Sequence, residues 1–133
     1  LPLAYGNLNL IDIDAAPGAF GILGASLGGL MACFTGLRMP EIFGSVLSQS
    51  VACVIPGYEF GLFELIHAGI GRQLRIWMDV GRSETMLDAN RRMSALLDEK
   101  GYQAQYREYD AGHNYTAWRD DLWRGLEYLF PPK

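Results

Sequence analysis

The chain alternates between short apolar runs and longer segments with helical periodicity, and this alternation limits its possible folds more than any other feature. The short runs are typical of buried strands, whereas the longer segments repeat apolar residues every three or four positions. Strands that alternate with helices form a mostly parallel sheet with helices on its faces. The sequence therefore predicts an α/β fold. The expected strands are 19–25, 44–50, 74–80 and 104–110, and the expected helices are 27–38, 86–100 and 115–130.

Two stretches do not fit the alternation. Residues 1–18 give mixed signals, with a possible strand at 8–13. Residues 51–72 carry several glycines and a proline around an apolar middle. Such an insertion can form a lid over a ligand site, or it can be an ordinary crossover helix near 59–68. We expect residues 1–133 to form one piece of a single domain.

Composition excludes several classes of protein. Half of the 133 residues are hydrophobic and 12% are aromatic, which excludes a disordered chain. The net charge of −4 and the presence of only two lysines argue against a nucleic-acid surface. No apolar run approaches the roughly 18 residues of a membrane span. The first 14 residues contain no basic residue, so we do not expect a signal peptide there, and the compartment stays open, with the cytoplasm slightly favoured.

The cysteines are expected to be structural. Cys33 and Cys53 lie 20 positions apart and form no C-x-x-C pair. A free cysteine usually behaves as a small buried hydrophobe. Together with His67 and His113 they are too scattered to suggest a zinc site. We therefore expect two buried free thiols and no metal.

The sharpest local motif is the G-x-S-x-G pattern of Gly24-Ala25-Ser26-Leu27-Gly28, which is followed by Gly29. It lies between an expected strand and an expected helix, where a tight turn can hold a serine hydroxyl clear of the backbone. Glycines at a helix start cost about 1 kcal/mol each relative to alanine, which favours a close approach at a site. The alternative is a glycine-rich turn that happens to contain a serine. A phosphate-binding loop does not fit, because no lysine follows. Ser26 is the candidate nucleophile.

A serine nucleophile needs a base, and the sequence offers two histidines. His113 follows the fourth expected strand, at the edge of the sheet where parallel strands end and ligand sites lie. His67 lies within an apolar segment, where a partly buried structural histidine is expected. His113 is therefore the preferred base.

The base in turn needs an anion that fixes its tautomer. Glu84 follows the third expected strand and gives the chain order Ser, Glu, His of α/β-hydrolases. Asp79 competes because it ends that strand, and Asp110 competes because it lies three residues before the histidine. Glu84 could also be an ordinary first-turn acid of a helix capped by Ser83. Position alone leaves Glu84 and Asp79 open.

The order of four segments adds a resemblance. From residue 19 onward the chain resembles the carboxyl-terminal part of the enterochelin-esterase-like group of α/β-hydrolases, which includes feruloyl esterases and mycolyltransferases of the antigen 85 type. This resemblance implies that Ser26 is the nucleophile, Glu84 the acid and His113 the base. The matching segments are GILGASLGGLMA, PEIFGSVLSQS, LRIWMDVGRSE and GHNYTAWRDDLWRGLEYLF.

The resemblance also implies what the chain lacks. The family fold has about eight strands, whereas four are expected here. We therefore expect the carboxyl-terminal half of a larger domain, which a missing amino-terminal segment or self-association would complete. The Leu27 N–H would be one oxyanion donor, and the second would lie outside the chain.

Aromatic residues follow the candidate base. Tyr115 and Trp118 could line an acyl or aryl pocket, although core packing at helical spacing explains them equally well. The expected function is a serine carboxylic-ester hydrolase that works through an acyl-enzyme on a small-molecule ester, with no cofactor. An acyltransferase of the same fold and a catalytically silent binding module are the alternatives.

Overall fold

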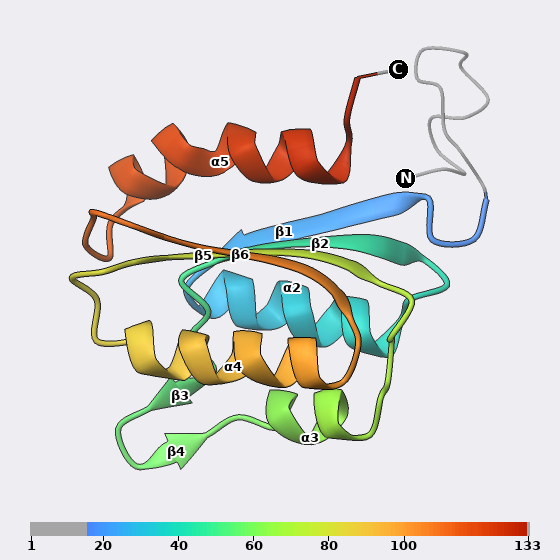
Figure 1. Ribbon diagram of the computed structural model, residues 1–133, viewed down its shortest axis with the longest axis horizontal. Helices are drawn as coiled ribbons and strands as arrows, with labels where there is room; N and C mark the ends of the chain where they lie inside the picture. Colours follow the sequence, from blue (N-terminus) through green and yellow to red (C-terminus); the bar gives the residue numbers. More distant parts are fainter. Residues whose placement is uncertain (1–15, 133) are drawn as a thin grey trace.

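The computed structural model describes residues 16–132 as a parallel four-stranded sheet with helices on both faces (Figure 1). The α/β class is confirmed, and each expected strand and helix lies within one residue of its observed bounds. The possible strand at 8–13 lies outside the described residues. The strands, in the order β1-β2-β5-β6 across the sheet, are β1 (Phe20–Ala25), β2 (Phe43–Gln49), β5 (Arg75–Gly81) and β6 (Gln103–Tyr109). The long helices are α2 (Leu27–Arg38), α4 (Leu87–Glu99) and α5 (Tyr115–Leu129).

The helices divide the core into two layers. Helices α2 and α4 cover one face of the sheet and α5 covers the other (Figure 1). The larger apolar cluster fills the layer beneath α2 and α4, and a smaller one around Leu47, Trp77 and Leu129 lies beneath α5. Cys33 and Cys53 are buried and free in the larger cluster, as expected. Burial raises the pKa of the Cys33 thiol to about 12 and that of Cys53 to about 11, so both stay protonated.

The segment 51–72 contains both a hairpin and a helix. Strands β3 (Val54–Ile55) and β4 (Tyr58–Glu59) pair antiparallel, and α3 (Leu62–His67) follows. Helix α3 contacts α2 and α4 and buries three apolar residues against the core. His67 ends this helix on its exposed side, so the expectation of a partly buried histidine was wrong. The buried positions of α3 are Leu62, Phe63 and Ile66, and position 67 falls outside that stripe.

The register of the sheet brings the ends of its strands into one row. Ala25 pairs with Gln49, Gln49 with Asp79, and Asp79 with Arg107. Because all four strands are parallel, the loops that follow them leave from the same edge. The sheet therefore gathers side chains from four distant parts of the sequence at its carboxyl edge.

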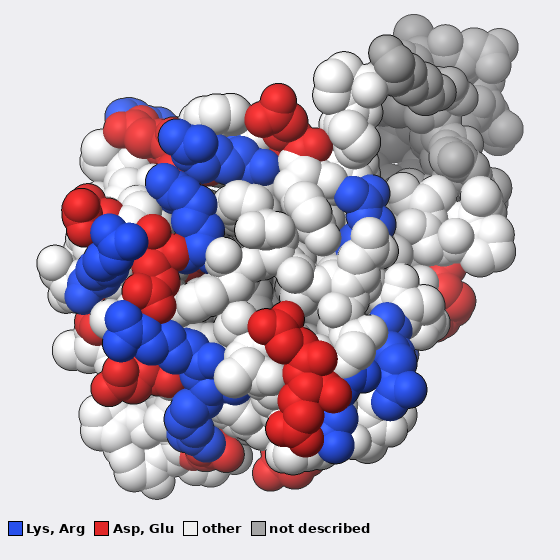
Figure 2. Space-filling view, viewed as in Figure 1, with Lys and Arg blue, Asp and Glu red and all other residues white. Residues whose placement is uncertain are grey.

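The charged surface is mixed in sign. On the face seen in Figure 2, arginines and carboxylates are interspersed, and Arg91 pairs with Glu108 at 2.7 Å. Within residues 16–132, no helix combines the length and apolar character that crossing a bilayer requires.

An apolar stripe is exposed along α2, and Leu23 of the neighbouring β1 is exposed as well. Leu23 is 56% exposed, Leu27 58%, Met31 57% and Phe34 41%, and the three helical positions fall on one face because they are spaced by four and three residues. Among the described residues, β1 pairs only with β2, so its outer edge is free. Free strand edges and exposed apolar stripes are features typical of association surfaces.

We expect the 133-residue chain, produced alone, to associate through this stripe. Met31→Glu with Phe34→Glu should shift the mass measured by light scattering toward a monomer, because the charges oppose burial of the stripe. Tyr58→Glu is the control, since Tyr58 is 60% exposed on the β3–β4 hairpin and should leave the mass unchanged. A well-folded monomer of the unaltered chain would contradict the expectation.

Candidate active site

Ser26 occupies the tight turn between β1 and α2. Its φ of 57° and ψ of −121° are rare for a residue with a side chain and cost on the order of 1–3 kcal/mol. Backbone hydrogen bonds hold it there: its N–H donates to the Gln49 carbonyl at 2.9 Å, and its carbonyl accepts from Leu30 and Ala52. The turn is therefore tied to the end of the neighbouring strand, and it directs the Ser26 hydroxyl away from the sheet.

The glycines around Ser26 are not equivalent. A Cβ at Gly24 would overlap the carbonyl oxygen of Gly28, and one at Gly29 would lie 2.7 Å from the Ser48 Oγ. A Cβ at Gly28 would meet nothing within 4 Å. Close approach thus explains Gly24 and Gly29, as the sequence suggested. It does not explain Gly28, which lies on the exposed side of the first turn of α2.

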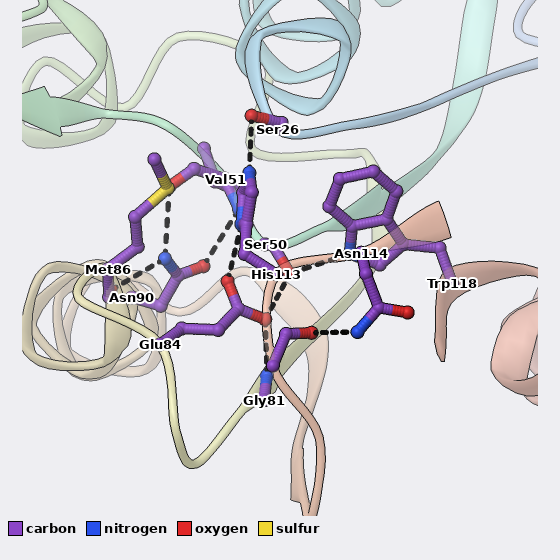
Figure 3. A network of polar contacts seen from close by, with 11 residues as sticks. Ser26, Ser50, Val51, Gly81, Glu84, Met86, Asn90, His113, Asn114 and Trp118 are labelled. Atoms are coloured by element: carbon purple, nitrogen blue, oxygen red, sulfur yellow. Dashed lines mark hydrogen bonds and ion pairs between the residues drawn. The ribbon is translucent and has the colours of Figure 1, made fainter. Parts of the chain in front are cut away.

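The structure brings Ser26, His113 and Glu84 into one hydrogen-bonded chain (Figure 3). The His113 Nε2 lies 2.9 Å from the Ser26 Oγ, and the His113 Nδ1 lies 2.7 Å from the Glu84 Oε2. The Glu84 side chain has no exposed surface, whereas that of His113 is 35% exposed. The hydrogen-bonded chain therefore runs from a fully buried carboxylate to a partly exposed histidine.

The second carboxylate oxygen of Glu84 also has partners. The Gly81 N–H donates to Oε1 at 2.8 Å, and the Ser50 hydroxyl lies 2.7 Å from the same oxygen. These bonds compensate for burying a carboxylate. Gly81 is required here, because a Cβ would overlap the Ala111 carbonyl.

The competing acids lie elsewhere. Asp79 accepts from the Trp77 indole at 2.8 Å and from the Gln49 amide at 3.3 Å. Burial raises the pKa of this carboxyl to about 6, an effect that the bonds from Trp77 and Gln49 only partly offset. Asp110 forms an exposed ion pair with Arg82 at 2.9 Å. Neither carboxylate has a hydrogen bond to His113.

The alternative role of Glu84 as a helix-start acid does not apply. Helix α4 begins at Leu87, so neither Ser83 nor Glu84 lies in its first turn. Glu84 instead turns back from the loop toward β2, where it meets Ser50 (Figure 3).

The sequence reasoning missed two supporting residues, Ser50 and Asn90, and it did not foresee the hydrogen bond of Trp118, which it had named only as a pocket candidate. Ser50 and the Trp118 indole N–H extend the network beyond Glu84, and Asn90 binds both the N–H and the carbonyl of Val51. The position of Ser50 at the end of an expected strand could have indicated its place. Nothing in the periodicity of α4 marks Asn90, because a polar residue at a buried helical position resembles a surface one.

Leu27 and two aromatic residues complete the predicted set. Leu27 is the first residue of α2, where a backbone N–H has no acceptor within the helix. Tyr115 is 73% exposed, so core packing does not explain it. With Trp118, Leu23 and Gln49 it lines a groove of about 280 Å³ beside β1. Among residues 16–132, no group of three or more His, Cys, Asp or Glu side chains could hold a metal ion.

Comparison with known proteins agrees with this geometry. Residues 12–129 match the family described as "Putative esterase". The chain belongs to this family. It is 38% identical over 118 residues to the iron(III) enterobactin esterase of Escherichia coli strain K12, a match that covers 84% of this chain and 30% of the relative. A corresponding esterase of Dickeya dadantii is 32% identical over 81% of this chain and 28% of the relative. The chain thus spans about 30% of the length of these curated relatives.

Solved structures place this fold among esterases. An enterochelin esterase from Shigella flexneri is similar with a TM-score of 0.84 and 33% identity, over 99% of this chain and 35% of that one. A ferulic acid esterase is similar in fold alone, with a TM-score of 0.79 and 21% identity, over 97% of this chain and 56% of that one. The four strands described here therefore correspond to part of an α/β-hydrolase-type sheet.

Asp79 predicts a pH dependence of stability. The pKa of its carboxyl is about 6 in the folded protein, above the usual value of 3.8. The folded state therefore binds the carboxyl proton more tightly than the unfolded state does. The contribution of Asp79 to the free energy of unfolding is therefore present at low pH and is lost as the pH rises from about 4 through about 6. A difference of about two pKa units corresponds to about 3 kcal/mol.

Asp79→Asn removes this titration. Denaturant unfolding of the full-length protein at about pH 5 and about pH 7.5 should show a smaller loss of stability with pH in the variant than in the wild type. Asp110→Asn, which alters an exposed carboxylate, is the control and should keep the wild-type difference. If the pH dependence of stability were unchanged in Asp79→Asn, the raised pKa would not belong to Asp79.

Proposed function

We propose that the protein containing this chain is a serine carboxylic-ester hydrolase in which Ser26 is the nucleophile, His113 the base and Glu84 the acid. The observation that carries this proposal is the hydrogen-bonded chain from the Ser26 Oγ through both ring nitrogens of His113 to a buried carboxylate, at 2.9 and 2.7 Å. Membership of the esterase family supports it independently.

The proposed reaction begins with acylation. The Ser26 Oγ attacks the ester carbonyl carbon while the His113 Nε2 takes the hydroxyl proton, and the buried Glu84 stabilises the imidazolium. The oxyanion accepts a hydrogen bond from the Leu27 N–H. When the tetrahedral intermediate collapses, the C–O bond breaks and His113 returns its proton to the departing alcohol. Water, activated by His113, then attacks the acyl-Ser26 ester and releases the acid.

The remaining part of the site belongs to a further segment of the protein. The chain spans about 30% of its curated relatives, and β1 presents a free edge beside an exposed apolar stripe. We propose that additional strands cover this edge and supply the second oxyanion donor. Removing one such donor costs about 10²–10³ in rate, so the chain alone should be poorly active.

Iron(III) enterobactin is the first ester to test, because the relatives at 30% identity or more are named for its hydrolysis. The exposed Tyr115 and the partly buried Trp118 beside Ser26 would contact an acyl or aryl group in the groove. Feruloyl esters, short acyl esters and glutathione-type thioesters complete the panel. Adding a sugar hydroxyl as acceptor distinguishes hydrolysis from acyl transfer.

Ser26→Ala in the full-length protein should abolish labelling by a fluorophosphonate and reduce ester turnover below about 1% of the wild type. Glu84→Gln should reduce kcat by about 10³- to 10⁴-fold, because a neutral amide does not stabilise the imidazolium. Asp79→Asn is the matched control and should retain activity at a temperature where it is folded.

Retained labelling in Ser26→Ala would remove Ser26 from this role. A harmless Glu84→Gln with a damaging Asp79→Asn would transfer the acid to Asp79. A wild-type protein that neither reacts with the probe nor turns over any ester of the panel would favour a catalytically silent module.

A further inference from the structure

Ser50 has an unusual backbone conformation and no role in the proposed reaction so far. It follows the last residue of β2, is completely buried and has a φ of 51°. Ser26 is the other described non-glycine residue with a positive φ. Strained backbone of this kind persists only where the surroundings hold it, and it gathers at functional sites. The Ser50 N–H donates to the Asp79 carbonyl at 2.7 Å, which fixes the turn.

The hydroxyl of Ser50 links α5 to Glu84. The Trp118 indole N–H donates to the Ser50 Oγ at 2.9 Å, and the Ser50 Oγ lies 2.7 Å from the Glu84 Oε1 (Figure 3). An indole nitrogen can only donate, and a serine hydroxyl has one proton. The Ser50 proton must therefore point to Glu84, which gives the chain a single direction from Trp118 through Ser50 to Glu84.

Trp118 is itself held in place from two sides. The Gln49 amide donates to its backbone carbonyl at 3.1 Å, and its ring meets the His113 ring edge-on with centroids 4.8 Å apart. The adjacent residues Gln49 and Ser50 thus contact Ser26 through a backbone bond, Glu84 through the hydroxyl and the first turns of α5 through Trp118. The end of β2 connects the three elements that carry the proposed triad.

We propose that Ser50, supported by the Trp118 N–H, is a positioning residue for the acid of the triad. With Ser50 and the Gly81 N–H both on Oε1, the Glu84 carboxylate keeps Oε2 directed at the His113 Nδ1. This contact places the ring proton on Nδ1 and leaves the Nε2 lone pair free for the Ser26 proton. The inference rests on the proposed function, because it assigns Ser50 a role in the same triad.

The test uses Ser50→Ala, Ser50→Gly and Trp118→Phe in the full-length protein. Glycine adopts a positive φ without strain, whereas alanine does not. If Ser50→Ala and Ser50→Gly lower activity equally, the loss comes from the missing hydroxyl and not from a folding defect. Trp118→Phe keeps an aromatic ring in the groove and removes the N–H donor together with part of the ring. Ser48→Ala is the matched control, since Ser48 is an equally buried serine of β2 with no hydrogen bond to Ser26, Glu84 or His113.

With 4-nitrophenyl butyrate as the probe ester, both Ser50 variants should lower kcat by about 10- to 100-fold and change KM by less than about twofold. The acid limb of kcat/KM should move to higher pH, because a carboxylate with one donor fewer binds the histidine proton more strongly. Trp118→Phe should lower kcat by less than about tenfold, and combining it with Ser50→Ala should add nothing further, since both act through the same oxygen of Glu84.

A proton NMR measurement keeps this inference separate from the proposed function. The downfield resonance of the His113 Nδ1 proton should shift in Ser50→Ala and Ser50→Gly and stay unchanged in Ser48→Ala. If Ser26→Ala leaves turnover intact, the proposed function fails whatever this resonance does. If Ser26 is essential but Ser50→Ala behaves as Ser48→Ala in kcat, pH profile and resonance, the positioning role is overturned. If the losses in kcat from Trp118→Phe and Ser50→Ala add in the double variant, or if Trp118→Phe changes KM alone, the link from Trp118 to Glu84 is overturned and Trp118 is left with only its proposed contact to the substrate.

Discussion

Parallel pairing of β1, β2 and β5 is the constraint on which the whole site depends. It puts Ala25, Gln49 and Asp79 in one row, so that the turns after these strands must share one edge of the sheet. The bond from the Ser26 N–H to the Gln49 carbonyl transmits this register to the nucleophile. A shift of one residue in the pairing would reverse every side chain along the strand and separate Ser26 from β2.

The same edge carries two buried carboxylates in different surroundings. Glu84 receives donors on both oxygens, from Gly81 and Ser50 on one and from His113 on the other. Asp79 receives both of its donors on Oδ2, while Oδ1 is buried with no hydrogen-bond partner among the described residues. This imbalance fits the raised pKa of Asp79. Solvation by the protein, rather than position along the strand, thus distinguishes the proposed acid from its neighbour.

Much of this arrangement follows from the sequence. Apolar runs and helical stripes located every long element, and the strand-end rule brought Ser26 and His113 to one edge. The rule could not choose between Glu84 and Asp79, because both lie beside the end of β5 and only the path of the loop after Gly81 decides which side chain turns inward. Ser50, and the contact that Trp118 makes with it, were hidden for the same reason. Their roles depend on hydrogen bonds between elements more than 30 residues apart, which no local pattern encodes.

In the proposed mechanism, Ser26 carries the acyl group during turnover. Rapid acid quenching of the full-length protein with a 4-nitrophenyl ester, followed by mass spectrometry of its peptides, measures this directly. We expect a burst of 4-nitrophenol and an acyl mass increment on the peptide that contains Ser26. An acyl increment on a different residue would contradict this role of Ser26. Full turnover without acylated Ser26, sampled at times shorter than one catalytic cycle, would contradict it as well.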